Sequence, residues 1–221
     1  MGSNRDIITI DGPAGAGKTT VARGVAKRLG WTYLDTGAMY RAAALAAFEK
    51  GTPFDDEPGM TRLLEILQLE ILPGPEGVKV IMDGQDVTAL IRRPQVSGLA
   101  SAVAAQPVVR RAMVDLQKKI GASGRLVADG RDMGTVVFPE ARVKVFLTAS
   151  LEIRSERRYL ELSGMGEKVM REAVEKDMAA RDYADSTRKI ARLRPAADAV
   201  LIDAGLLSPE EVIDQILAMT T

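Results

Sequence analysis

Short apolar runs recur along the chain and alternate with longer segments rich in helix-forming residues. The apolar runs cover residues 7–10, 31–34, 126–128, 143–147 and 199–202. Short apolar runs separated by helical segments are typical of a parallel sheet with helices on both faces. The pattern therefore predicts an α/β fold with a five-stranded parallel sheet flanked by helices.

The pattern changes between residues 67 and 87. Residues 69–72 alternate in polarity, residues 73–77 are rich in Pro and Gly, and a second strand-like run at 78–82 ends at Asp83-Gly84. An Asp-Gly pair between two strand-like runs predicts a hairpin. We therefore expect a small antiparallel meander inserted into the α/β core. Helices are expected next, over residues 95–104 and over residues 107–120, where Pro107 suits the first turn.

A long charged segment, residues 150–194, is expected to be helical. Its arginines are Arg154, Arg157, Arg158, Arg171, Arg181, Arg188, Arg192 and Arg194. The chain contains no repeat, low-complexity tract or linker. Residues 1–221 are therefore predicted to form one domain, with an insert over 62–104 and an arginine-rich helical segment over 154–188.

A glycine-rich motif follows the first predicted strand. It fits the pattern G-x-x-x-x-G-K-[ST] without a mismatch and comprises Gly12, Pro13, Ala14, Gly15, Ala16, Gly17, Lys18, Thr19 and Thr20. Between a strand and a helix this pattern is typical of a phosphate-binding loop, because glycines let several backbone N–H groups face one anion. The helix that follows adds the positive end of its dipole. We expect Lys18 to reach the β- and γ-phosphates and Thr19 to offer its hydroxyl to Mg²⁺. The motif therefore predicts that the protein binds a nucleoside triphosphate.

A second polar cluster lies at the end of the predicted strand 126–128. It contains Asp129, Arg131 and Asp132, with Gly130 and Gly134 among them. Parallel α/β sheets bind ligands at the carboxyl ends of their strands. A strand-end Asp in phosphate-loop proteins commonly holds Mg²⁺ or a water on it. The alternative interpretation is a polar turn with a local Arg–Asp pair.

Two further clusters supply candidate groups for a second substrate and for the transferred phosphoryl group. Thr36, Tyr40 and Arg41 follow the second predicted strand, where Thr36 is expected to cap the next helix. Arg181 and Arg188 belong to the charged segment near the C-terminus. Arginines stabilise the charge of phosphoryl transfer, although a solvated charged helix face would carry the same pattern.

Composition limits the chemistry that is available. The chain has 221 residues, 46% of them hydrophobic, and its 30 basic and 30 acidic residues balance. Zero net charge argues against a nucleic-acid polymer as partner. The sequence has no cysteine and no histidine, so an acid–base step has to use a carboxylate, Lys, Tyr or water. Asn4 is the only asparagine, which excludes an Asn-Lys-x-Asp guanine motif.

Targeting signals are not evident in the sequence. No apolar run approaches the length of a membrane span, and the N-terminus lacks a signal-peptide core. We expect a soluble, cytoplasmic protein that does not bind membranes, and we interpret residues 1–3 as a cloning remnant.

Several of these stretches together resemble bacterial cytidylate kinases. The matching residues are 8–13 with 15–18, 34–41, 128–139 (ADGRDMGTVVFP) and 195–198, together with Ser101, Arg110, Asp185 and Arg188. The resemblance spans nearly the whole chain, and the run at 129–135 is far more specific than the phosphate-binding loop alone. It implies direct in-line transfer of a phosphoryl group from Mg-ATP to CMP or dCMP, giving ADP and CDP or dCDP.

The resemblance also implies roles for individual residues. The base would be read by Ser101, Arg110 and Asp132, the monophosphate held by Thr36, Tyr40, Arg41, Arg131 and Arg188, and the ribose held by Asp185. The lid over ATP would carry Arg157, Arg158 and Arg181. The catalytic set would be Lys18, Asp129, Arg131, Arg181 and Arg188, with Thr19 on Mg²⁺ and Asp129 acting on the ion through water. The insert over 62–104 would form part of the CMP site.

Two positions depart from the family pattern, and two other functions stay open. Thr36 stands where Ser is common, and it keeps the hydroxyl. Arg192 replaces a frequent Pro, a change that bears on the stiffness of the lid and not on the chemistry. Residues 72–77 are expected to vary freely. The alternatives are another small-molecule kinase with UMP, AMP or shikimate as acceptor, and a nucleotide-binding module without turnover. A monomer is expected, with ATP and CMP or dCMP as its partners.

Overall fold

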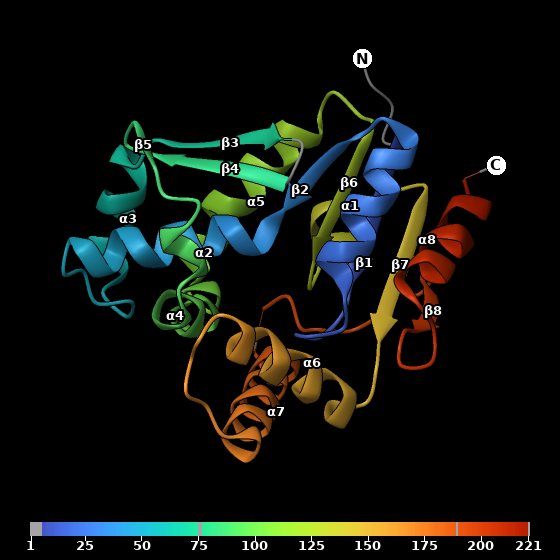
Figure 1. Ribbon diagram of the computed structural model, residues 1–221. Helices are drawn as coiled ribbons and strands as arrows, with labels where there is room; N and C mark the ends of the chain where they lie inside the picture. Colours follow the sequence, from blue (N-terminus) through green and yellow to red (C-terminus); the bar gives the residue numbers. More distant parts are fainter. Residues whose placement is uncertain (1–5, 75–76, 189, 221) are drawn as a thin grey trace.

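A five-stranded parallel sheet forms the centre of the computed structural model, which describes residues 6–74, 77–188 and 190–220 (Figure 1). Its strand order is β2-β6-β1-β7-β8. The strands are β1 (Ile7–Asp11), β2 (Thr32–Asp35), β6 (Leu126–Gly130), β7 (Val143–Thr148) and β8 (Val200–Asp203). The predicted sheet is thus confirmed, with strand ends shifted by one or two residues. Residues 1–3, interpreted as a cloning remnant, lie outside the described residues.

The register of the strands brings several carboxylates to one edge of the sheet. Asp35 of β2 lies opposite Asp129 of β6, and Asp11 of β1 lies opposite Gly130. Parallel strands end at the same edge, so residues far apart in the sequence meet there. This edge is also where the first strand passes into the glycine-rich motif.

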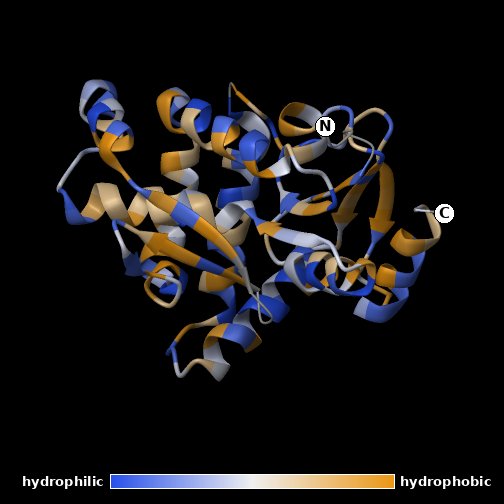
Figure 2. Ribbon diagram, turned by 90° about the horizontal axis from the view of Figure 1, so that it is seen from above, coloured by the Kyte–Doolittle hydropathy of each residue, from blue (hydrophilic) through white to orange (hydrophobic). Residues whose placement is uncertain are grey.

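Helices cover both faces of the sheet and divide the hydrophobic core in two. On one face, α1 (Lys18–Leu29) and α8 (Pro209–Ala218) pack against Ile8 and Ile10. On the other face, Ile7 and Leu34 join a core formed with α2 (Thr36–Glu49), α3 (Glu57–Ile66), α4 (Pro94–Ala104) and α5 (Pro107–Gly121). Successive strand residues point to opposite faces, which explains why Ile7 and Ile8 enter different cores. Figure 2 shows hydrophobic residues concentrated on the strands of the central sheet.

A small antiparallel sheet of three strands is inserted between α3 and α4. It consists of β3 (Leu69–Gly74), β4 (Gly77–Met82) and β5 (Gln85–Asp86), as the sequence predicts. The turn between β4 and β5 places Asp83 and Gly84 at φ 48° and 79°. Two successive positive φ values suit an Asp-Gly hairpin turn. Within the predicted turn at 73–77, residues 75–76 lie outside the described residues.

A helical hairpin projects beyond the carboxyl edge of the sheet. It consists of α6 (Leu151–Gly164) and α7 (Arg171–Thr187), which lie below the sheet in Figure 1 and share a small apolar cluster. The expectation of a helical segment up to residue 194 is wrong, because α7 ends at Thr187. The carbonyl of Asp185 accepts a hydrogen bond from the Leu193 amide, and Ala191 has φ 53°. These features turn the chain back toward the sheet.

Candidate active site

The glycine-rich motif forms a tight loop between β1 and α1. Gly12 has φ 152°, and a Cβ at this position would lie 2.0 Å from the carbonyl oxygen of Leu147. Only glycine fits this approach without moving the backbone of β7. Gly17, with φ 91°, caps α1, and the first turn of the helix carries no acidic residue. The unpaired N–H groups of that turn therefore form a suitable site for an anion.

Lys18 is buried at the start of α1. Its ammonium donates a hydrogen bond of 2.6 Å to the carbonyl of Pro13. Burial lowers the pKa of Lys18 to about 7, and the positive charge of Arg131 acts in the same direction. Asp129 and Asp11 oppose this shift. An anion near the ammonium would favour its charged form.

Asp129 lies at the centre of a hydrogen-bonded group. Its carboxylate accepts bonds from the Thr19 hydroxyl at 3.0 Å and from the Tyr33 hydroxyl at 3.2 Å. Burial raises the pKa of Asp129 to about 7, and the charge of Asp35 adds to the rise. The Thr36 hydroxyl donates to the backbone carbonyl of Asp129 at 2.6 Å. The structure thus brings Thr19, Thr36 and Asp129 together.

The cap of α2 differs from the expectation. Asp35, and not Thr36, occupies the N-cap position and accepts a hydrogen bond of 2.8 Å from the Ala38 amide. Thr36, the next residue, is already the first residue of the helix. Its hydroxyl donates a hydrogen bond to the backbone of the neighbouring strand β6. Asp35 also pairs with Arg41 at 3.1 Å.

The Thr19 and Asp129 oxygens suit a hard cation. Among the described residues, no group of three or more acidic side chains gathers around a metal position. A cation held here would therefore take most of its ligands from phosphate oxygens and water. Such sparse protein coordination is usual for Mg²⁺ beside a nucleotide.

Arg110 and Asp132 form a buried ion pair beside Tyr40. The guanidinium of Arg110 donates to the Asp132 carboxylate and lies 5.6 Å from the centre of the Tyr40 ring. A weaker bond of 3.4 Å links Arg110 to the carbonyl of Ala104. Burial raises the pKa of Asp132, and the charges of Arg110 and Arg188 oppose that rise. The pair presents a donor and an acceptor side by side in a buried position.

A second group of charges connects the sheet edge with the helical hairpin. Asp185 of α7 accepts from Arg131 at 2.9 Å and lies 3.5 Å from Arg188. The guanidinium of Arg181 donates to the backbone carbonyl of Ser97 in α4. The hairpin therefore contacts both the cluster after β6 and α4, which belongs to the predicted insert over 62–104.

Several buried donor atoms of this region have no hydrogen-bond partner among the described residues. They include the Tyr40 hydroxyl, which lies near the side-chain amide of Gln117, together with Nε of Arg41 and Nη2 of Arg188. A buried polar atom without a partner is costly, and it commonly marks the position of a ligand or a water. Burial raises the pKa of Tyr40 to about 12, and the neighbouring positive charges of Arg110 and Arg188 oppose this rise.

Some predicted residues are not part of this cluster. Arg157 donates to the carbonyl of Ala204 at 2.7 Å, and Arg158 pairs with Glu161 at 2.7 Å on its own helix. Ser101 lies half-buried on α4, and Thr20 is exposed.

Two buried residues of the site region were not assigned individual roles from the sequence. Arg154 donates to the carbonyl of Ala14 in the glycine-rich loop at 3.1 Å and to Asp182 of α7 at 2.6 Å. Asp11 accepts two backbone hydrogen bonds from the segment after β6. The sequence signal for Asp11 is its position between a strand and the first glycine, whereas nothing in the sequence separates Arg154 from the other arginines of its segment.

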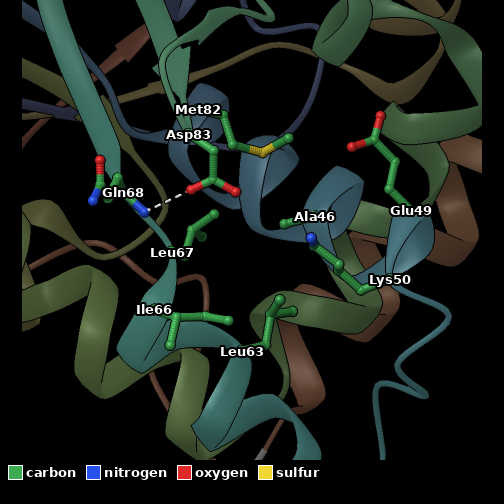
Figure 3. A pocket seen from close by; sticks show the side chains of 9 residues that line it. All are labelled: Ala46, Glu49, Lys50, Leu63, Ile66, Leu67, Gln68, Met82 and Asp83. Carbon is green, nitrogen blue, oxygen red and sulfur yellow. Dashed lines mark hydrogen bonds between the residues drawn. The ribbon is translucent and has the colours of Figure 1, made fainter.

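A cavity of about 260 Å³ lies away from these residues, between α2, α3 and the insert (Figure 3). Its apolar lining includes Ala46, Leu63 and Met82, and Glu49 and Lys50 stand at its side. None of the predicted site residues lines it. The geometry of the charged groups, and not this cavity, identifies the candidate active site.

The protein has a phosphate-binding loop at the carboxyl edge of a parallel sheet, and an arginine-bearing helical hairpin faces this loop. These features identify the protein as a P-loop kinase. The family model described as "Cytidylate kinase" matches residues 8–221. The chain belongs to the cytidylate kinase family.

Curated relatives agree with this assignment. The chain is 53% identical to a cytidylate kinase of Carboxydothermus hydrogenoformans over 95% of each sequence. It is 44% identical to one of Pasteurella multocida, over 98% of this chain and 95% of that protein. In fold it is similar to the crystal structure of an uncharacterized protein from Eubacterium ventriosum, with a TM-score of 0.54, 12% identity and 98% of both chains covered. Within the described part of the chain, no helix is long and apolar enough to span a membrane.

Proposed function

We propose that the protein transfers the γ-phosphoryl group of ATP to CMP or dCMP, giving ADP and CDP or dCDP. Membership of the cytidylate kinase family supports this reaction. The observation that carries it is the Arg110–Asp132 pair, buried close to the phosphate-binding loop. A guanidinium and a carboxylate side by side would complement the carbonyl and the amino group on the edge of cytosine.

ATP is proposed to bind through its phosphates on the glycine-rich loop. The backbone N–H groups of the loop from Ala14 to Thr20 and the ammonium of Lys18 would face the negative charge. Thr19 would be a direct ligand of Mg²⁺, with Asp129 acting through water, and bound Mg²⁺ would neutralise charge on the phosphates. Arg157 and Arg158 on α6 would contact ATP from the helical hairpin, the proposed lid over 154–188.

The acceptor nucleotide is proposed to bind between the cluster after β6, α2 and the segment 62–104. Its phosphate would take the unpartnered donors of Tyr40, Arg41 and Arg188, together with Thr36 and Arg131. Asp185 would accept hydrogen bonds from the ribose hydroxyls. These assignments explain why donors that are buried in this region lack partners within the protein.

Recognition of cytosine is proposed to rest on Asp132, Arg110 and Ser101. The Asp132 carboxylate would accept from the N4 amino group, and Arg110 would donate to the carbonyl and ring nitrogen of the base. Uracil presents a carbonyl where cytosine presents the amino group, so it would be repelled by the carboxylate. Sites with buried polar groups reject a mismatched ligand strongly, because those groups are left unpaired.

The transfer itself needs no strong general base. The attacking oxygen belongs to a phosphate that is already anionic, and the chain contains no histidine. Lys18, Arg131, Arg181 and Arg188 would hold the two phosphates in line and offset the charge that spreads over the transferred group. Closure of the hairpin would exclude water from the reacting phosphates. We further propose that the protein acts as a monomer in the cytoplasm.

A coupled ADP-release assay tests the proposal. Mg-ATP would be supplied with CMP, dCMP, UMP, AMP, GMP or shikimate in turn. We expect turnover that strongly favours CMP and dCMP. Preference for another acceptor would refute the assigned substrate but keep the kinase class, and ATP binding without turnover on any acceptor would favour the non-catalytic module.

A further inference from the structure

Asp11 is a buried carboxylate that the proposed reaction does not use. It is the last residue of β1, it directly precedes Gly12, and only 4% of its surface is exposed. An ionised carboxylate is costly to bury unless hydrogen bonds or charges compensate. Burial raises the pKa of Asp11 to about 6, against the effect of two backbone hydrogen bonds and of Lys18. A neutral residue would cost less here, which raises the question of what the carboxylate does.

Both oxygens of Asp11 accept hydrogen bonds from one short turn. Oδ1 accepts from the Met133 amide and Oδ2 from the Gly134 amide, each at 2.8 Å. These two residues begin a π-helical turn, Met133–Val137. The first N–H groups of a helical turn have no partner within it. Asp11 thus satisfies them from a different strand, across more than a hundred residues of sequence.

The residue that would ordinarily cap this turn is Asp132. It occupies the N-cap position, but its side chain makes no cap hydrogen bond. Its carboxylate is instead paired with Arg110. Because Asp11 takes over the capping of the turn, the Asp132 carboxylate is free to face Arg110 and a substrate.

The turn also packs closely on β1. A Cβ on Gly134 would lie 3.0 Å from the hydroxyl oxygen of Thr9, which is two residues before Asp11 on the same strand. The turn therefore has little room to shift along the strand while both bonds to Asp11 are kept. Since Asp11 is joined directly to the phosphate-binding loop, one residue ties the position of Asp132 to the position of that loop.

We propose that Asp11 is a positioning residue that sets base selectivity by fixing the orientation of Asp132. This inference rests on the proposed function. Both oxygens of Asp11 are engaged by the turn, so its effect is expected on the acceptor base more than on ATP. Asp11→Asn keeps one acceptor oxygen but turns an amide group toward the second N–H, so one hydrogen bond is lost and a repulsion replaces it.

The test compares kcat/KM for CMP and for UMP in the full-length protein. We expect Asp11→Asn to lower the CMP-to-UMP ratio about tenfold, with the KM for ATP changed by less than about threefold. Asp11→Ser is a second variant, smaller and neutral, should the amide prevent folding. Circular dichroism and a cooperative urea transition identify the folded variants. A folded Asp11 variant with an unchanged ratio would overturn the inference.

Thr9→Val is the matched control. Thr9 is buried on the same strand near the same turn, and its hydroxyl has no partner among the described residues. Its replacement should leave the CMP-to-UMP ratio within about twofold of the wild-type value, because no hydrogen bond to the turn is removed. An equal loss of selectivity in Thr9→Val would mean that general disturbance of the strand, and not the Asp11 bonds, is responsible.

A double-mutant cycle separates positioning from an independent effect. If Asp11 acts through Asp132, adding Asp11→Asn to Asp132→Ala should change the ratio by less than about twofold. If the double variant instead showed the product of the two single-variant reductions in the CMP-to-UMP ratio, the inference would be contradicted. A wild-type protein that shows no preference for CMP would refute the proposed function itself, whereas a preference kept in Asp11→Asn would refute only the role of Asp11.

Discussion

Replacing Arg110 and Asp132 singly and together can distinguish their effect on recognition of the base from their effect on the stability of the protein. Their side chains are 5% and 3% exposed, so each charge is almost fully desolvated. Removing one partner of a buried pair costs about 3–5 kcal/mol, whereas replacing both by apolar residues is often neutral or stabilising by about 1–4 kcal/mol. A pair retained for stability and a pair retained for substrate recognition therefore respond differently to single and double replacement.

Asp132→Ala should lower the free energy of unfolding by about 3 kcal/mol. The remaining guanidinium of Arg110 would keep a weak bond of 3.4 Å to the Ala104 carbonyl and the Tyr40 ring at 5.6 Å. A cation–π contact of this kind contributes about 1 kcal/mol, which places the loss toward the lower end of the range for broken pairs. The double variant Arg110→Met/Asp132→Leu should recover stability to within about 1 kcal/mol of the wild-type protein.

Urea unfolding, followed by circular dichroism and by the fluorescence of the single tryptophan, Trp31, measures stability. The ADP-release assay with CMP and UMP measures recognition. In both variants the ratio of kcat/KM for CMP to kcat/KM for UMP should fall about tenfold to a hundredfold. The reason is that charged hydrogen bonds contribute about 1.5–3 kcal/mol each. A double variant that is stable and still prefers CMP would refute the base-reading role. A double variant as unstable as Asp132→Ala would refute the energetic argument.

Three further outcomes are expected. Lys18→Met should reduce turnover at least about a hundredfold without lowering the melting temperature, because it removes a buried ammonium; near-normal turnover would exclude the loop as the ATP site. Arg154→Met should lower the free energy of unfolding by about 3 kcal/mol, because it leaves Asp182 partly buried without its cation. The exposed control Arg171→Met should cost less than about 1 kcal/mol, and equal losses would contradict the assigned packing of the hairpin on the loop. Burial raises the pKa of Asp11 from 3.8 to about 6, so the folded state holds this proton more tightly than the unfolded chain. The contribution of Asp11 to stability should therefore decrease as the pH rises from about 4 to about 6. The difference in unfolding free energy, wild type minus Asp11→Asn, should be smaller at pH 7 than at pH 4.5, and a larger difference would contradict the shift.

The strands were predictable because buried parallel strands are short, apolar and separated by helices. The insert was predictable from the Asp83-Gly84 turn, whose two positive φ values suit this residue pair. The end of α7 was not predictable, since charged helix-forming residues continue past it. It is set by long-range geometry: Asp185 and Arg188 face the sheet edge, and the following chain folds back onto them.

The candidate site was predictable to the extent that it depends on strand ends. Parallel strands bring Asp129 and the phosphate-binding loop to one edge whatever the loops between them. Partners of individual side chains were not predictable. Asp35 and Thr36 are both good N-cap residues, and the neighbouring strand decides between them by engaging the Thr36 hydroxyl. The hydrogen bonds between Asp11 and the turn after β6 were not predictable either, because no sequence spacing relates residues so far apart.

Buried charge at the sheet edge is best explained by the binding of anions. Lys18, Asp129 and Asp132 are each desolvated enough to shift their pKa toward the neutral form, which is unfavourable for a protein selected for stability alone. The carboxylates hold the neighbouring cations in fixed positions, as Asp185 does for Arg131 and Arg188. Less side-chain entropy is then lost when phosphates bind, because the cations are already ordered. The same ordering serves catalysis, since preorganised charges stabilise the transition state without rearranging during the reaction.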